Sequence, residues 1–256
     1  MRVAQSLSAL TRVDLCLGRY AHMSTLRTPG SQTLLTTIKA CLQNVDRFLE
    51  ETYDLEFRDP PPSRYFIVMI AQEEFAKAFI VYLIRESAIP FTLSVLRAIN
   101  DHVCKQLIGI VMDYMIMHWD ELDEMRALIA KDFVAGDGLP NDVGSAVDIL
   151  RYERIGCWES RSWVWAEDPE YDPSALAVAN GKRDRRKQDS LYVRIGRDGR
   201  VCSMPATITE QETEEELERA RRYRRFMNSL LEEGDRSERF RKAMAVIKLI
   251  FVGQGK

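Results

Sequence analysis

Two stretches of the sequence decide the fold: RYFIVMIAQEEFAKAFIVYLI, residues 64–84, and FTLSVLRAINDHVCKQLIGIVM, residues 91–112. Each is strongly apolar and long enough for a buried helix, and Pro90 separates them. Charged side chains are costly in apolar surroundings unless something pairs with them. Because both stretches nevertheless carry charged residues, the sequence predicts one shared polar site inside a helical bundle.

The charged residues of these two stretches are spaced so that they can meet. Glu73 and Lys77 are four residues apart and Glu74 and Lys77 three apart, and both spacings share one helix face. His102 and Lys105 are also three apart. Antiparallel packing would set Glu73 or Glu74 against Lys105 or His102. Buried charge clusters often serve only to fix helix register, so a purely structural role stays open beside a functional one.

Arg97 and His102 form an R-x4-H pattern in the second stretch. Histidine suits proton transfer near neutral pH, and the arginine fork can bind two phosphate oxygens. Together they suffice for RNA cleavage without a metal ion: the histidine takes the ribose 2′-OH proton and the arginine stabilises the phosphate charge. Five residues of an ideal helix turn about 140°. The two side chains therefore do not share one face unless the helix is distorted or the side chains reach around it. A site shared across a dimer interface would relax this constraint.

The rest of the chain predicts further helices and one small hairpin. Asp198-Gly199 supplies turn chemistry between the β-prone segments 191–195 and 200–203. Residues 140–180 resist assignment, apart from a short helix at Val143–Tyr152. Helices are expected at Ser31 (as N-cap) to about Leu55, Ser63–Ser87, Thr92–Phe133, Glu210–Glu233 with Thr209 as N-cap, and Ser237–Val252.

These elements predict a mainly α protein, a helical bundle with a small C-terminal β-hairpin and additional helices. We expect an N-terminal segment at residues 1–30 and a helical core at 31–135. A C-terminal extension at 136–256 would carry the hairpin, at about 190–203, and two helices that pack on the core.

Composition narrows the class of protein. The 256 residues are 46% hydrophobic and 29% charged with a net charge of -3, which is ordinary for a folded soluble protein and gives no overall nucleic-acid signature. A local basic cluster at residues 182–187 is a candidate RNA contact or, equally, an exposed loop. Residues 66–84 contain three central charges, which argues against a membrane span. Five scattered cysteines without a CxxC pair predict reduced thiols in a cytoplasmic protein.

Known cofactor and metal motifs are missing from the sequence. It has no phosphate-binding P-loop, no GxGxxG before a helix and no GxSxG elbow. No glutamate has a histidine three residues later, as helical di-iron sites require. We therefore expect neither a cofactor nor a metal ion.

The segments AQEEFAKA, residues 71–78, and DHVCKQ, residues 101–106, resemble AbiV-type abortive-infection proteins of bacteria, which are grouped with the HEPN superfamily. The later Leu191-Tyr-Val193, the Asp198-Gly199 turn and Pro205 are similar to the family's trailing hairpin-and-helix segment. The resemblance implies a HEPN-like helical bundle, usually dimeric, with a role in anti-phage defence. It departs from the HEPN pattern at Ala98, where a polar residue usually follows the arginine.

The resemblance also implies a metal-independent ribonuclease that blocks translation or phage growth. Its R-x4-6-H motif falls on Arg97 and His102, and Asp101 supplies polarity within it. His102 would be general base and then acid, Arg97 would hold the scissile phosphate, and Lys105 would add positive charge. The orienting groups would be Glu73, Glu74 and Lys77. The implied partners are RNA (tRNA, rRNA or mRNA), a second copy of the chain, and a phage-encoded activator or partner, without a membrane. The alternative is a non-catalytic interaction protein that binds a phage or translation component.

Overall fold

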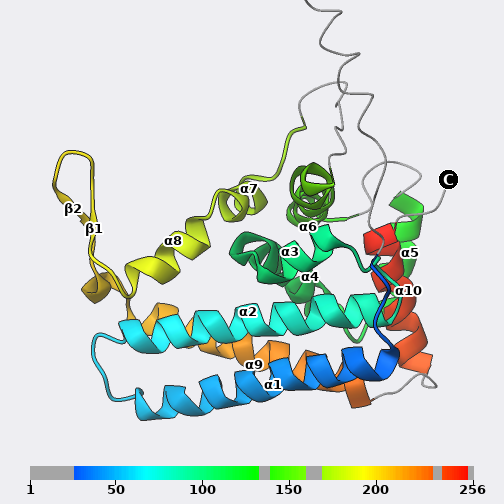
Figure 1. The fold of residues 1–256 in the computed structure, drawn as a ribbon, viewed down its shortest axis with the longest axis horizontal. Coiled ribbons are helices and arrows are strands. Elements are labelled where there is room, and N and C mark those ends of the chain that lie inside the picture. The colour runs from blue at the N-terminus through cyan, green and yellow to red at the C-terminus, as the bar shows by residue number, and fades with distance from the viewer. Residues whose placement is uncertain (1–25, 133–138, 160–168, 233–237, 253–256) are drawn as a thin grey trace, which may run out of the picture.

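The structure is a computed structural model that describes residues 26–132, 139–159, 169–232 and 238–252. The predicted mainly α fold is confirmed, with helices throughout and one two-stranded antiparallel sheet (Figure 1). The helices are α1 (Ser31–Asp54), α2 (Pro62–Arg85), α3 (Leu93–Asn100), α4 (His102–Met117), α5 (Leu122–Asp132), α6 (Asn141–Asp148), α7 (Pro173–Ala179), α8 (Lys182–Asp189), α9 (Glu210–Glu232) and α10 (Glu238–Val252). The strands are β1 (Arg194–Ile195) and β2 (Val201–Ser203).

Helix α2 lies at the centre of the molecule. Helix α1 packs one apolar face on it, with Leu34, Ile38, Val45 and Leu49 buried at helical spacing. Helices α9, α4 and α3 contact α2 as well, which explains why its apolar residues run nearly all round. In Figure 1, α1, α2 and α9 run alongside one another. Helices α3, α4 and α6 lie on the side of α2 that faces away from α1.

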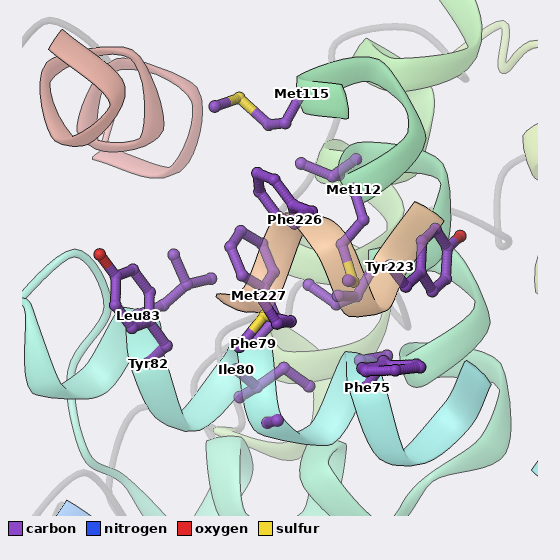
Figure 2. Close-up of a cluster of buried hydrophobic side chains, with 14 of the residues drawn as sticks. Phe75, Phe79, Ile80, Tyr82, Leu83, Met112, Met115, Tyr223, Phe226 and Met227 are labelled. Carbon is purple, nitrogen blue, oxygen red and sulfur yellow. The ribbon is translucent and has the colours of Figure 1, made fainter. Parts of the chain in front are cut away.

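Large apolar side chains of α2, α4 and α9 meet in the core. Figure 2 shows Phe75 and Phe79 of α2 among methionines of α4 and Tyr223, Phe226 and Met227 of α9. The rings of Phe79 and Phe226 lie 5.6 Å apart, within the range of favourable aromatic pairs. Residues from both sides of the expected boundary at 135/136 thus share one core. The boundary itself stays a prediction, and residues 1–25 lie outside the described residues.

Helices α4 and α9 approach each other closely at Gly109. The fully buried Tyr223 donates its hydroxyl hydrogen to the Gly109 carbonyl at 2.9 Å and accepts a hydrogen bond from Arg219 Nε at 3.0 Å. A Cβ atom at position 109 would lie 3.0 Å from that hydroxyl oxygen. The missing side chain therefore lets α9 brace the helix that carries His102 and Lys105.

The single helix predicted over 92–133 is wrong, because the chain breaks twice within it. Asp101 is extended, with ψ of 125°, and its carboxylate accepts a hydrogen bond from Cys104 N at 2.8 Å. It therefore ends α3 and caps α4, a role in which aspartate is among the most favourable residues. The second break follows Met117, where Trp119 packs its ring on Phe226 of α9 at 5.2 Å. The predicted end at Phe133 lies outside the described residues.

Other predicted boundaries hold with local corrections. Gly30, rather than Ser31, is the N-cap of α1, and the Ser31 hydroxyl instead accepts a hydrogen bond from Arg85. Thr209 caps α9 as predicted, and its hydroxyl accepts a hydrogen bond from Glu212 N at 3.2 Å. The predicted helix near 143–152 is α6, continued as a π-helix over Ile149–Gly156.

The hairpin is confirmed but short, and it projects at the end of the molecule that α8 occupies (Figure 1). Gly199 has a φ of 78°, which supports the predicted turn.

The structure also bears on two expectations from composition, the reduced cysteines and the lack of a membrane-spanning helix. Within the described chain, Cys41, Cys104, Cys157 and Cys202 are all free thiols. None of the described helices is both long and apolar enough to cross a membrane.

Candidate functional site

Glu73 of α2 is the centre of the polar cluster. Its side chain is only 3% exposed, so its charge requires partners. Lys187 Nζ of α8 lies 2.6 Å from Oε1, and Lys105 Nζ of α4 lies 3.1 Å from Oε2. Gln106 Nε2 donates a hydrogen bond to Oε1 at 3.2 Å. The predicted meeting of the two apolar helices thus occurs at this carboxylate.

The pKa of Glu73 lies below its usual range. Burial alone would raise this pKa, but the hydrogen bond from Lys187 and the charges of Lys105 and Lys187 outweigh burial and lower it. At neutral pH the side chain is therefore a buried carboxylate, which can only accept hydrogen bonds.

His102 connects this buried carboxylate to the surface. It is the first residue of α4, directly after the Asp101 break, and its side chain is 51% exposed. Nδ1 lies 2.5 Å from Glu73 Oε2. Since the carboxylate only accepts, Nδ1 carries the hydrogen, and Nε2 of the neutral ring keeps a free lone pair. An exposed imidazole oriented in this way can act as a general base through Nε2.

Helix α8 completes the cluster. Residues 182–187, for which an RNA contact and an exposed loop were the two alternatives, are helical, so the exposed loop is wrong. Lys187 is 4% exposed and approaches Asp184 Oδ1 at 2.8 Å as well as Glu73. Arg183 and Arg186 tie the helix to α9 through Glu216 and Glu212, at 2.8 and 2.7 Å. Most of the basic residues in this segment therefore hold the structure together and are not free for a ligand.

The structure separates the predicted site residues into two groups. Glu73, His102 and Lys105 meet, and Asp101 caps the helix that begins at His102. The other predicted residues, Glu74, Lys77 and Arg97, make no contact with this cluster among the described residues.

Glu74 and Lys77 pair with each other on the side of α2 that faces α1. Both act electrostatically on Cys41 of α1, where burial, and then the charge of Glu74, raises the pKa of the thiol. Among the described residues, neither Glu74 nor Lys77 contacts His102, so the structure does not support their expected role in orienting it.

Arg97 is exposed in the last turn of α3, and across the described ranges its side chain makes no hydrogen bond or ion pair. Asp101 interrupts the helix between Arg97 and His102, so the ideal-helix angle between them does not apply. Ala98, where HEPN motifs usually have a polar residue, is 2% exposed and belongs to the apolar core.

Three residues of the cluster were not predicted as site residues from the sequence: Lys187, Gln106 and Asp184. The available signal was the three-residue spacing of Asp184 and Lys187, which an i, i+3 pair on a helix would explain. Glu73, His102 and Asp184 each offer an atom of metal-ligand type, and these atoms lie within 4.8 Å of one another.

Fold and site together define a helical-bundle protein in which a buried carboxylate orients the half-exposed His102. The family model HEPN_AbiV, described as AbiV, matches residues 33–225, a range that includes every residue of the cluster. The chain belongs to this AbiV family of HEPN proteins, and membership indicates an abortive-infection function. Neither the curated proteins nor the solved structures contain a match to the chain.

Proposed function

We propose that the protein is a cytoplasmic anti-phage effector that cleaves RNA without a metal ion, with His102 as its catalytic residue. The observation that carries the proposal is the Nδ1 contact, 2.5 Å from a buried, ionised Glu73 on a half-exposed ring. This arrangement presents Nε2 to solvent as a proton acceptor.

The proposed reaction uses that geometry. His102 Nε2 takes the proton of a ribose 2′-OH, and the oxygen attacks the adjacent phosphorus. The bond from phosphorus to the 5′-oxygen breaks, and the imidazolium returns its proton to that leaving oxygen. The products carry a 2′,3′-cyclic phosphate and a 5′-OH. Glu73 stabilises the imidazolium that forms between the two steps, as a carboxylate does in a catalytic triad.

The other predicted residues take different parts. Arg97 is exposed and has no ion pair in the described chain, so its guanidinium is available to hold the scissile phosphate. Lys105 is 6% exposed and committed to Glu73, so it acts by positioning that carboxylate. RNA as substrate (tRNA, rRNA or mRNA), a homodimer and a phage-encoded activator belong to the same proposal.

The test compares wild type, His102→Ala and His118→Ala on tRNA and total bacterial RNA in EDTA. His118 is the matched control, because it caps the other end of α4 and lies outside the cluster. We expect wild type and His118→Ala to leave 2′,3′-cyclic phosphate ends, and His102→Ala to be slower by about 10²–10⁴-fold. Its melting temperature should stay near that of wild type, because a half-exposed ring contributes little to stability. Full cleavage by folded His102→Ala would refute the proposal.

A second candidate, a non-catalytic interaction protein, is favoured by one observation. The hairpin region exposes Tyr192, Val193, Ile195 and Val201, with exposed fractions between 55% and 66%. Clustered apolar side chains on a projecting element are typical of a protein-binding surface. Intact RNA with all three folded proteins would support this function, with a phage or translation component as the partner.

A further inference from the structure

The ammonium of Lys187 lies among the three groups of metal-ligand type in the cluster. Its Nζ is 2.6 Å from Glu73 Oε1, 2.8 Å from Asp184 Oδ1 and 3.1 Å from His102 Nδ1. Two carboxylate oxygens and an imidazole nitrogen form a donor set that suits zinc or manganese, once the ring hydrogen has moved from Nδ1 to Nε2. The cation that these groups surround is, however, a side chain of the same protein.

A second observation concerns Asp184. Its Oδ1 is buried and makes no hydrogen bond within the described residues, although Lys187 Nζ lies at ion-pair distance. A buried carboxylate oxygen without a hydrogen bond is costly unless a cation neutralises it. Gln188 Nε2 donates a hydrogen bond to Asp184 Oδ2 at 2.8 Å, so Oδ1 is the oxygen that is neutralised by charge alone, as an oxygen of a metal ligand would be.

We propose that Lys187 is the built-in cation of this site, whose ammonium takes the position that a divalent metal bound by Glu73, Asp184 and His102 would occupy. A metal ion and the ammonium would repel each other and compete for the same oxygens, so they exclude one another. Lys187 is a positioning residue: it holds the Glu73 carboxylate that fixes Nδ1 of His102. The proposal goes beyond RNA cleavage, because it concerns which cation the cluster holds when no RNA is bound.

It follows that removal of the ammonium should uncover a metal site. In Lys187→Ala, the two carboxylates lose their common cation while all three donor groups remain. Zinc would bind Nδ1 of His102, and the ring would then carry its proton on Nε2. In Lys187→Arg the guanidinium keeps a positive charge at the site, so zinc should remain excluded.

The test is zinc binding by the full chain without RNA. The sequence has three histidines, so the ring nitrogens of His102 can be followed individually in ¹⁵N spectra. With equimolar zinc, we expect the Nδ1 signal to move in Lys187→Ala and to stay in wild type and in Lys187→Arg. Zinc should also raise the melting temperature of Lys187→Ala, and the further change Asp184→Asn should weaken both effects.

Two results would overturn the proposal. One is zinc binding through Nδ1 of wild-type His102, which would make Lys187 a displaceable neighbour of a true metal site. The other is a folded Lys187→Ala that takes up no zinc at His102. If Lys187→Ala folds only when zinc is present, that dependence supports the proposal, and the wild-type measurement still provides an independent test.

Discussion

Glu73 is one carboxyl group through which the stability of the fold should depend on pH in the acid range. Lys187 and Lys105 lower its pKa in the folded protein despite the opposing effect of burial. In the unfolded chain a glutamate titrates near pH 4.3, so roughly above this value the folded state holds its full advantage. The advantage is lost as the pH falls through the lower pKa of the folded state, because the folded carboxylate must then be protonated.

We therefore expect the free energy of unfolding to fall as the pH drops below about 4.3. Urea unfolding of wild type and Glu73→Gln across the acid range measures this. The variant should be less stable at neutral pH, because the buried Lys105 and Lys187 lose the carboxylate that they share, but its stability should depend less on pH. An equally steep decline in the variant would show that other carboxylates dominate the acid response.

Only part of the cluster could be predicted from sequence. Charges on apolar helices stand out, which is why Glu73, Lys105 and His102 could be assigned to one site. Adjacent positions on a helix point about 100° apart, so only packing decides that Glu73 faces α4 while Glu74 faces α1. Lys187 follows Glu73 by 114 residues, and nothing local distinguishes it from the other basic residues of its segment.

At the scale of elements, the break at Asp101 positions His102. Because α4 begins afresh at this point, His102 occupies the first position of a helix and can be half exposed while its Nδ1 reaches a buried group. The apolar spacing continues through residue 101, which is why the sequence suggested one helix. The capping preference of Asp101 was the local signal for a boundary.

We expect Asp101→Ala to lower the free energy of unfolding by about 0.5–2 kcal/mol, because it removes the acceptor for Cys104 N. Asp101→Asn is the matched control, since asparagine caps helices about as well as aspartate. Urea unfolding of the two variants separates loss of the cap from loss of the charge. An equal loss of stability in both would assign the effect to the carboxylate charge instead.

At the scale of the whole molecule, the bundle brings distant segments to one site. Helices α2, α4 and α8 each supply members of the cluster, and α9 anchors α8 through Arg183 and Arg186. Sequence periodicity sufficed for the helical class and the hairpin. It could not supply the place of α8, because that helix has no apolar residue and is fixed by ion pairs.

The most direct test of the central claim, that His102 carries the defensive activity of this AbiV-family protein, is phage plating. Bacteria expressing wild type, His102→Ala or His118→Ala at equal protein levels would be infected with a panel of phages. We predict that wild type and His118→Ala reduce plaque numbers against the same phages, and that His102→Ala loses this protection. Equal protection by His102→Ala and wild type would contradict the account and leave the cluster with a structural role.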